Sequence, residues 1–77
     1  MLTFAQYQAL MIDPLFLGLV ERLSLLQAYQ QRFKESAGDR KLSEFETQVW
    51  LMFETEVDQA CEAIDDYFHH FLAANER

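Results

Sequence analysis

Hydrophobic residues recur at helical spacing along most of the chain. One series follows alternating intervals of three and four positions without a break, and a second, shorter series does the same with Gln30 as its polar member. Such intervals place side chains on one face of an α-helix, and no strand-like alternation of period two competes with them. We therefore predict an all-α fold. The series are Phe53, Val57, Ala60, Ile64, Tyr67, Phe71 and Ala74, and Phe16, Leu19, Leu23, Leu26 and Phe33, which Val20 and Tyr29 widen.

Two residue pairs have the spacing of a capping box, in which a hydroxyl residue and a Glu or Gln three positions later satisfy each other's backbone N–H groups. They are Thr3 with Gln6 and Ser43 with Glu46. A capping box marks the start of a helix. We therefore predict that one helix begins after Thr3 and another after Ser43.

The one Pro and the second Gly supply the remaining helix boundaries. Asp13 suits an N-cap and Pro14 suits the first helical position, while Gly38 suits a helix end followed by a connector. The sequence thus predicts a single helical domain over residues 1–77, with a short N-terminal helix and a long helical hairpin. The predicted helices span about 4–11, 14–36 and 44–75.

The chain has more apolar surface than a helical hairpin can hide. Hydrophobic residues make up 51% of its 77 residues, and a core of this size supplies only a few kcal/mol. The run from Trp50 to Phe53 is apolar all round the helix, so one facing helix cannot cover it. Two hairpins packed as an antiparallel four-helix bundle would do so, and we predict a homodimer. The alternative is a monomer in which the N-terminal helix covers the surplus.

Negative charge is concentrated in the last predicted helix. The net charge is −7, and no Lys or Arg lies between Lys41 and Arg77. Helical spacing places four of the acidic residues on one stripe opposite the apolar seam, with Asp66 beside it. The stripe is either an ordinary solvated face or a docking strip for a basic partner. Its four residues are Glu54, Asp58, Glu62 and Asp65.

Charge and motifs narrow the classes of function. Nucleic-acid affinity depends on Lys and Arg, which this chain lacks in number, so we expect no nucleic-acid binding. No phosphate loop, nucleophile elbow or metalloprotease motif is present, and we predict no catalytic residue and no cofactor. Cys61 lies eight and nine residues before His69 and His70, and we expect it to be a small, buried residue beside the seam.

These features predict a non-enzymatic protein–protein interaction module, such as a small acidic regulatory, adaptor or inhibitor protein. It would act through an aromatic-rich apolar flank and the acidic stripe on a partner with a basic or apolar surface. An acidic mimic of nucleic acid, which blocks a basic groove, is a further hypothesis. The candidate partner-binding residues are Trp50, Leu51, Phe53, Glu54, Asp58, Glu62 and Asp65.

A cluster of acids and histidines supports an alternative hypothesis. Acid-to-His spacings of three and four can hold a divalent metal, and a dimer could double one such cluster into a full site. This hypothesis predicts a metal-binding helical bundle, whereas the simpler interpretation is a set of surface residues. The candidate ligands are Glu62, Asp65, Asp66, His69 and His70.

Glu56 falls at the edge of the apolar stripe, where an acid needs a basic partner. Arg22, Arg32 and Lys34 on the preceding helix are the candidates. The pair would either fix the register of the hairpin from within the seam or form an ordinary salt bridge at its rim.

The N-terminal region lacks the basic segment of a secretory signal. Its longest uncharged apolar run, Leu15 to Val20, is far shorter than the roughly 20 residues of a membrane span. We expect no membrane association and a cytoplasmic location, in keeping with a single cysteine.

Overall fold

The computed structural model describes residues 2–75. They form three helices, α1 (Phe4–Met11), α2 (Pro14–Ala37) and α3 (Glu44–Asn75), and this part of the chain contains no strand. The all-α prediction is therefore confirmed. The bounds of α1 and α3 agree with those expected from the sequence, and α2 continues one residue further than expected.

Both capping boxes form and explain where α1 and α3 begin. The Gln6 N–H donates to Thr3 Oγ1 at 3.1 Å, and the Thr3 N–H donates to the Gln6 side chain at 2.9 Å. At α3 the Glu46 N–H donates to Ser43 Oγ at 3.2 Å, and the Ser43 N–H donates to Glu46 Oε1 at 3.0 Å. Each box satisfies two backbone donors that would otherwise lack helical partners.

Helix α2 starts and stops at the residues that the sequence marks. Asp13 Oδ1 accepts a hydrogen bond from the Leu15 N–H at 2.9 Å, and Pro14 occupies the first turn. At the other end the Gly38 N–H donates to the Lys34 carbonyl at 3.1 Å, and Gly38 has φ 58° and ψ −137°. Residues with a Cβ rarely adopt this conformation, so glycine permits the chain to leave the helix here.

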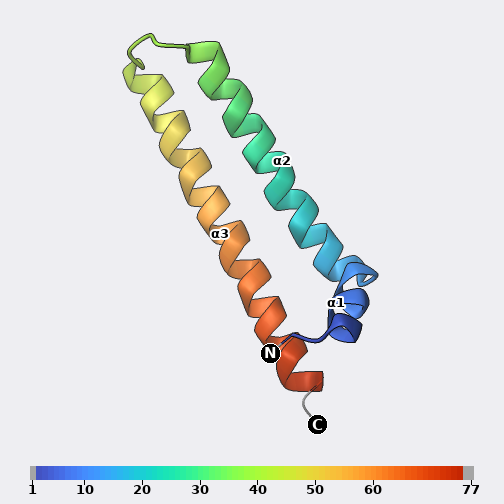
Figure 1. The fold of residues 1–77 in the computed structure, drawn as a ribbon. Helices are drawn as coiled ribbons and strands as arrows, with labels where there is room; N and C mark the ends of the chain where they lie inside the picture. The colour runs from blue at the N-terminus through green and yellow to red at the C-terminus, as the bar shows by residue number, and fades with distance from the viewer. Residues whose placement is uncertain (1, 76–77) are drawn as a thin grey trace.

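Helices α2 and α3 lie side by side and antiparallel, and α1 folds against α2 at the end opposite the connector (Figure 1). Aromatic rings join the long helices at both ends of their seam. Near the connector the Phe33 ring lies 6.3 Å from that of Trp50 and 6.0 Å from that of Phe53. Near α1 the rings of Phe16 and Tyr67 are 6.1 Å apart. The predicted apolar series thus meet each other as the interhelical seam.

The core between these helices is thin. Only four hydrophobic residues in the described part of the chain are buried, and the remaining seam residues are mostly half-buried. The molecule extends over 53 × 20 × 16 Å, and its radius of gyration is 16.5 Å. A compact domain of this length would have a radius of gyration of about 11 to 12 Å. The four buried residues are Leu10, Phe16, Ala37 and Ala60.

Helix α1 covers only one end of the hairpin and leaves its long faces open. Phe4 and Tyr7 on α1 are themselves exposed, and so is Tyr29 on α2, which the sequence had placed at the edge of the seam. Across residues 2–75, no helix combines the length and apolar character needed to cross a membrane. The exposed large apolar residues are Leu2, Phe4, Tyr7, Met11, Ile12, Leu15, Leu17, Leu25, Tyr29, Phe45, Leu51 and Met52.

Candidate protein-docking surface

The acidic stripe runs along the outer side of α3. All four of its carboxylate residues are exposed, and no ion pair within residues 2–75 reaches any of them. Because α3 has no Lys or Arg over its described length, these charges have no permanently cationic side chain one turn away on their own helix. We call Glu54, Asp58, Glu62 and Asp65 the acidic face.

Two apolar residues border the acidic face at its connector end. Trp50 Nε1 donates a hydrogen bond to Glu54 Oε1 at 2.7 Å, which fixes the half-buried indole beside the first carboxylate of the face. Leu51 lies three positions before Glu54 and is 48% exposed. The result is an apolar contact point rimmed by negative charge, the composition that protein-binding surfaces use for their central anchors. We call Trp50, Leu51 and the acidic face together the docking surface.

Phe53 belongs to the seam and not to the docking surface. Its half-buried ring faces that of Phe33 on α2 at 6.0 Å. The same periodic series that predicted the seam begins at Phe53, so that signal already indicated its place. Of the other six predicted partner-binding residues, Leu51 and the four residues of the acidic face are exposed on the outer side of α3. Trp50 is half-buried between the two sides, because its ring also packs 6.3 Å from that of Phe33.

The structure does not assemble the predicted metal ligands into a site. No group of three or more His, Cys, Asp or Glu side chains among the described residues is placed to hold a metal ion. His70 Nδ1 lies 2.7 Å from the carbonyl oxygen of Asp66. A carbonyl can only accept, so this contact places a proton on Nδ1. The ring of the other histidine, His69, packs 6.0 Å from that of Phe68.

Glu56 pairs with Arg22, one of its three candidate partners. Arg22 Nη2 lies 3.1 Å from Glu56 Oε2, and the two side chains are 52% and 40% exposed. The pair therefore bridges α2 and α3 at the rim of the seam. Ion pairs in such a position contribute at most about 1 kcal/mol.

Two further polar contacts link segments that the sequence did not connect. Arg40 donates two hydrogen bonds of 2.6 Å to the Glu46 carboxylate, which also accepts from the Ser43 N–H, and these bonds lower the pKa of Glu46 to about 2. The Tyr67 hydroxyl donates to Asp13 Oδ2. Both contacts stabilise the ends of the hairpin.

Cys61 is exposed, which corrects the expectation that it is buried. Its neighbour Ala60 occupies the seam position, and adjacent helical residues point about 100° apart. Cys61 therefore lies beside the seam on the solvent side.

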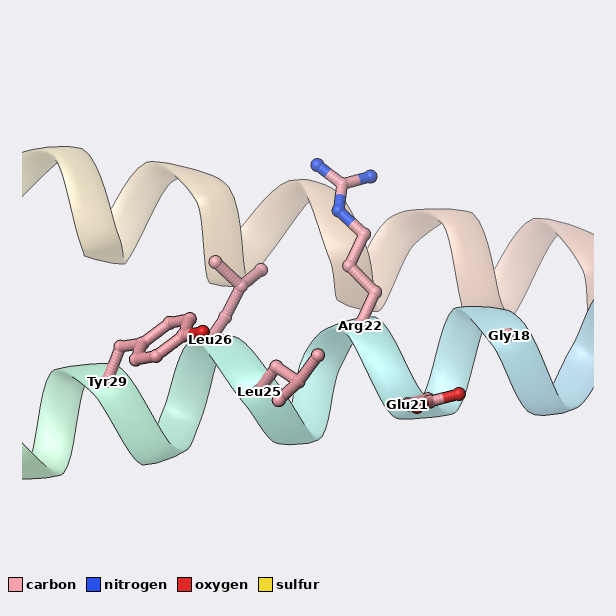
Figure 2. Close-up of a pocket in the computed structure, with 6 residues that line it drawn as sticks. All are labelled: Gly18, Glu21, Arg22, Leu25, Leu26 and Tyr29. Carbon is pink, nitrogen blue, oxygen red and sulfur yellow. The ribbon is translucent and has the colours of Figure 1, made fainter.

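A hollow on α2 is the feature that sequence reasoning missed. It has a volume of about 340 Å³ and is lined by Gly18, Glu21, Arg22, Leu25, Leu26 and Tyr29 (Figure 2). The signal was present in the spacing, because intervals of seven and four place Gly18, Leu25 and Tyr29 on one face.

Comparison with known proteins gives no relative for this arrangement. No protein-family model, no curated protein and no solved structure matches the chain.

Proposed function

We propose that the chain is a non-enzymatic, cytoplasmic protein–protein interaction module that works as a homodimer of helical hairpins. Its docking surface on α3 binds a partner protein with a basic surface. The observation that carries this proposal is the Trp50 indole, held by Glu54 beside exposed Leu51 at the end of the acidic face. Trp is enriched among the residues that dominate binding energy at protein interfaces.

The acidic face gives this docking surface its selectivity. Four exposed carboxylates that no ion pair among the described residues reaches create a local negative potential, which attracts a basic partner and repels an acidic one. Such attraction raises the association rate most at low salt, because the screening length is only about 10 Å at 0.1 M ionic strength. The apolar anchor then slows dissociation by removing water from its contact.

The test combines charge reversal with a matched control. The triple variant Asp58→Lys/Glu62→Lys/Asp65→Lys reverses three charges of the acidic face and leaves the Trp50–Glu54 bond intact. The control Gln27→Lys/Gln31→Lys/Glu35→Lys/Asp39→Lys makes the same change in net charge outside α3, at exposed residues that do not line the hollow on α2. Tagged wild-type protein is used to capture and identify a partner. The affinity of this partner for the wild type and for each purified variant is then measured by calorimetry at low and high salt.

We expect the triple variant to weaken binding by about tenfold or more, or at least ~1.4 kcal/mol, and to remove most of the salt dependence. The control should retain both affinity and salt dependence. Leu51→Ala should weaken binding without changing the salt dependence. Equal affinity of wild type and the triple variant would refute the acidic face as the docking surface.

A further inference from the structure

The chain exposes more surface than a compact monomer of its mass. Its accessible surface is 6054 Å² for 9.1 kDa. Compact monomers of this mass expose about 4,900 Å², so the excess is about 1,200 Å². A stable protein–protein interface buries about 800 Å² on each partner. The hairpin therefore has enough surplus surface for one complete interface.

The hollow on α2 shows where this interface lies. Leu25 and Tyr29 project beside the hollow and are 50% and 51% exposed, while Gly18 contributes no side chain (Figure 2). A Cβ added at Gly18 would meet nothing within 4 Å. The face thus combines projecting apolar side chains with an empty recess about two turns from Leu25 and about three turns from Tyr29.

The same face continues from α2 onto α3. The Arg22–Glu56 ion pair crosses from one helix to the other on this side of the hairpin. Met52 lies one helical turn before Glu56 and is 51% exposed, so it extends the apolar surface next to the hollow. We call Gly18, Arg22, Leu25, Tyr29, Met52 and Glu56 the groove face.

Charge identifies the occupant of the groove face as a second copy of this chain. With a net charge of −7, two copies repel each other wherever their acidic faces would meet. Beside the hollow Arg22 and Glu56 neutralise each other, so Glu21 is the one lining carboxylate without an ion pair among the described residues, against four such carboxylates on the acidic face. Met52 and Glu54 lie two residues apart on α3 and so point about 160° apart, which turns Glu54 away from the groove face.

We propose that two copies of the chain dock groove face to groove face about a twofold axis, with Leu25 and Tyr29 of each copy against the Gly18 recess of the other. An isologous contact of this kind uses one patch twice, so projections and recess must both be present on it. The long helices then form a four-helix assembly whose acidic faces remain outside. This inference rests on the dimer proposed above and assigns its surface.

The test is the solution mass of the full chain, measured by light scattering during size exclusion over a range of concentrations. We expect wild type to show twice the 9.1 kDa chain mass. Leu25→Glu places a charge in the contact, and Gly18→Leu fills the recess, where an added Cβ meets no atom of its own chain within 4 Å. Both variants should show the mass of a single chain at concentrations where wild type is dimeric.

Two controls keep the dimer and the docking surface separate. Ser24→Leu adds the same side chain to another side of α2, and Leu51→Glu adds a charge to the docking surface. Both should remain dimeric. Helicity is followed by circular dichroism. Leu favours a helix more than Gly does, so Gly18→Leu should not lower helicity through propensity. A loss of helix in Gly18→Leu but not in Ser24→Leu would therefore come from the lost dimer contact and would also support the groove face.

Two results would overturn the inference in distinguishable ways. If the wild type had the mass of a single chain at every concentration, both the proposed dimer and its proposed surface would be refuted. A dimer that persists in Gly18→Leu and Leu25→Glu would retain the proposed dimer but reject the groove face. Capture of a basic partner is measured separately and bears on the docking surface alone.

Discussion

The Tyr67 hydroxyl donates a hydrogen bond to Asp13 Oδ2, although the two residues lie 54 positions apart. The other oxygen of the same carboxylate accepts from the Leu15 N–H and caps α2. One side chain therefore starts α2 and also holds α3 against it. The bond from Tyr67 is the main cause that lowers the pKa of Asp13, and the bond to Asp13 raises the pKa of Tyr67.

Replacing Tyr67 by Phe should lower the free energy of unfolding near neutral pH, because the ring stays in place while the bond to Asp13 is lost. A carboxylate with a lowered folded pKa stabilises the fold above its ordinary pKa of 3.8, and this contribution disappears as pH falls through the folded value. The stability difference between wild type and variant should therefore shrink in acid. Urea denaturation at a series of pH values measures it.

Tyr7→Phe is the matched control, since it removes a hydroxyl from an exposed tyrosine of α1. It should leave the pH dependence unchanged. If Tyr67→Phe matched wild type at neutral pH, the bond to Asp13 would contribute nothing to holding α3.

Glu46 should make the hairpin sensitive to acid in a defined range. Arg40 and the Ser43 N–H lower its pKa from 4.5 to about 2, so its contribution to stability is complete above pH 4.5 and lost as pH falls toward 2. Glu46→Gln should reduce stability most above pH 4.5 and approach wild type at the acid end. Glu44→Gln removes a carboxylate from the same first turn and should leave the loss of stability below pH 4.5 unchanged. Thermal unfolding followed by circular dichroism measures both.

The helices could be predicted because their signals are local. Each boundary depends on residues within four positions of one another, such as Thr3 with Gln6 or Gly38 with Lys34. Hydrophobic spacing likewise predicted which side of α2 and of α3 faces the seam, apart from the exposed Tyr29, because periodicity is a property of a single helix.

Contacts between helices could not be predicted, because they depend on the register of the hairpin. Spacing left three basic partners for Glu56, and only the alignment of α2 with α3 selects Arg22. The bond between Tyr67 and Asp13 depends on the same alignment. The contact between Arg40 and Glu46 was unexpected for another reason: the capping box alone already explains a Glu at position 46.

The groove face shows what a helical wheel leaves out. By helix propensity alone, Gly18 lowers the stability of α2 by roughly 1 kcal/mol relative to Ala. Spacing places Leu25 and Tyr29 on the same face as Gly18, but only the three-dimensional arrangement shows that the three line one hollow.

Gly38→Ala should reduce the free energy of unfolding by about 1 to 3 kcal/mol, the usual cost of placing a Cβ in a strained backbone region. Gly38 has φ 58° and ψ −137°, and an added Cβ would meet no atom within 4 Å, so the cost comes from the backbone alone. Ser36→Ala, in the last turn of α2, should change stability little. Urea denaturation of both variants at one protein concentration compares their free energies of unfolding. If Gly38→Ala left the free energy of unfolding unchanged, the connector would be able to adopt another backbone path.

Phe33 should be the most sensitive aromatic residue near the connector, because its ring contacts both Trp50 and Phe53. Phe33→Ala should reduce the free energy of unfolding by about 2 to 3 kcal/mol, below the 3 to 5 kcal/mol of a fully buried Phe because this ring is half-buried. Trp50 is the single tryptophan, so its fluorescence reports the change directly and should shift to longer wavelength in the folded variant. Phe4→Ala removes an exposed ring from α1 and should neither lower the free energy of unfolding by this amount nor shift the Trp50 fluorescence. If the two variants were equally stable, the ring cluster would not be what holds the connector end of the seam together.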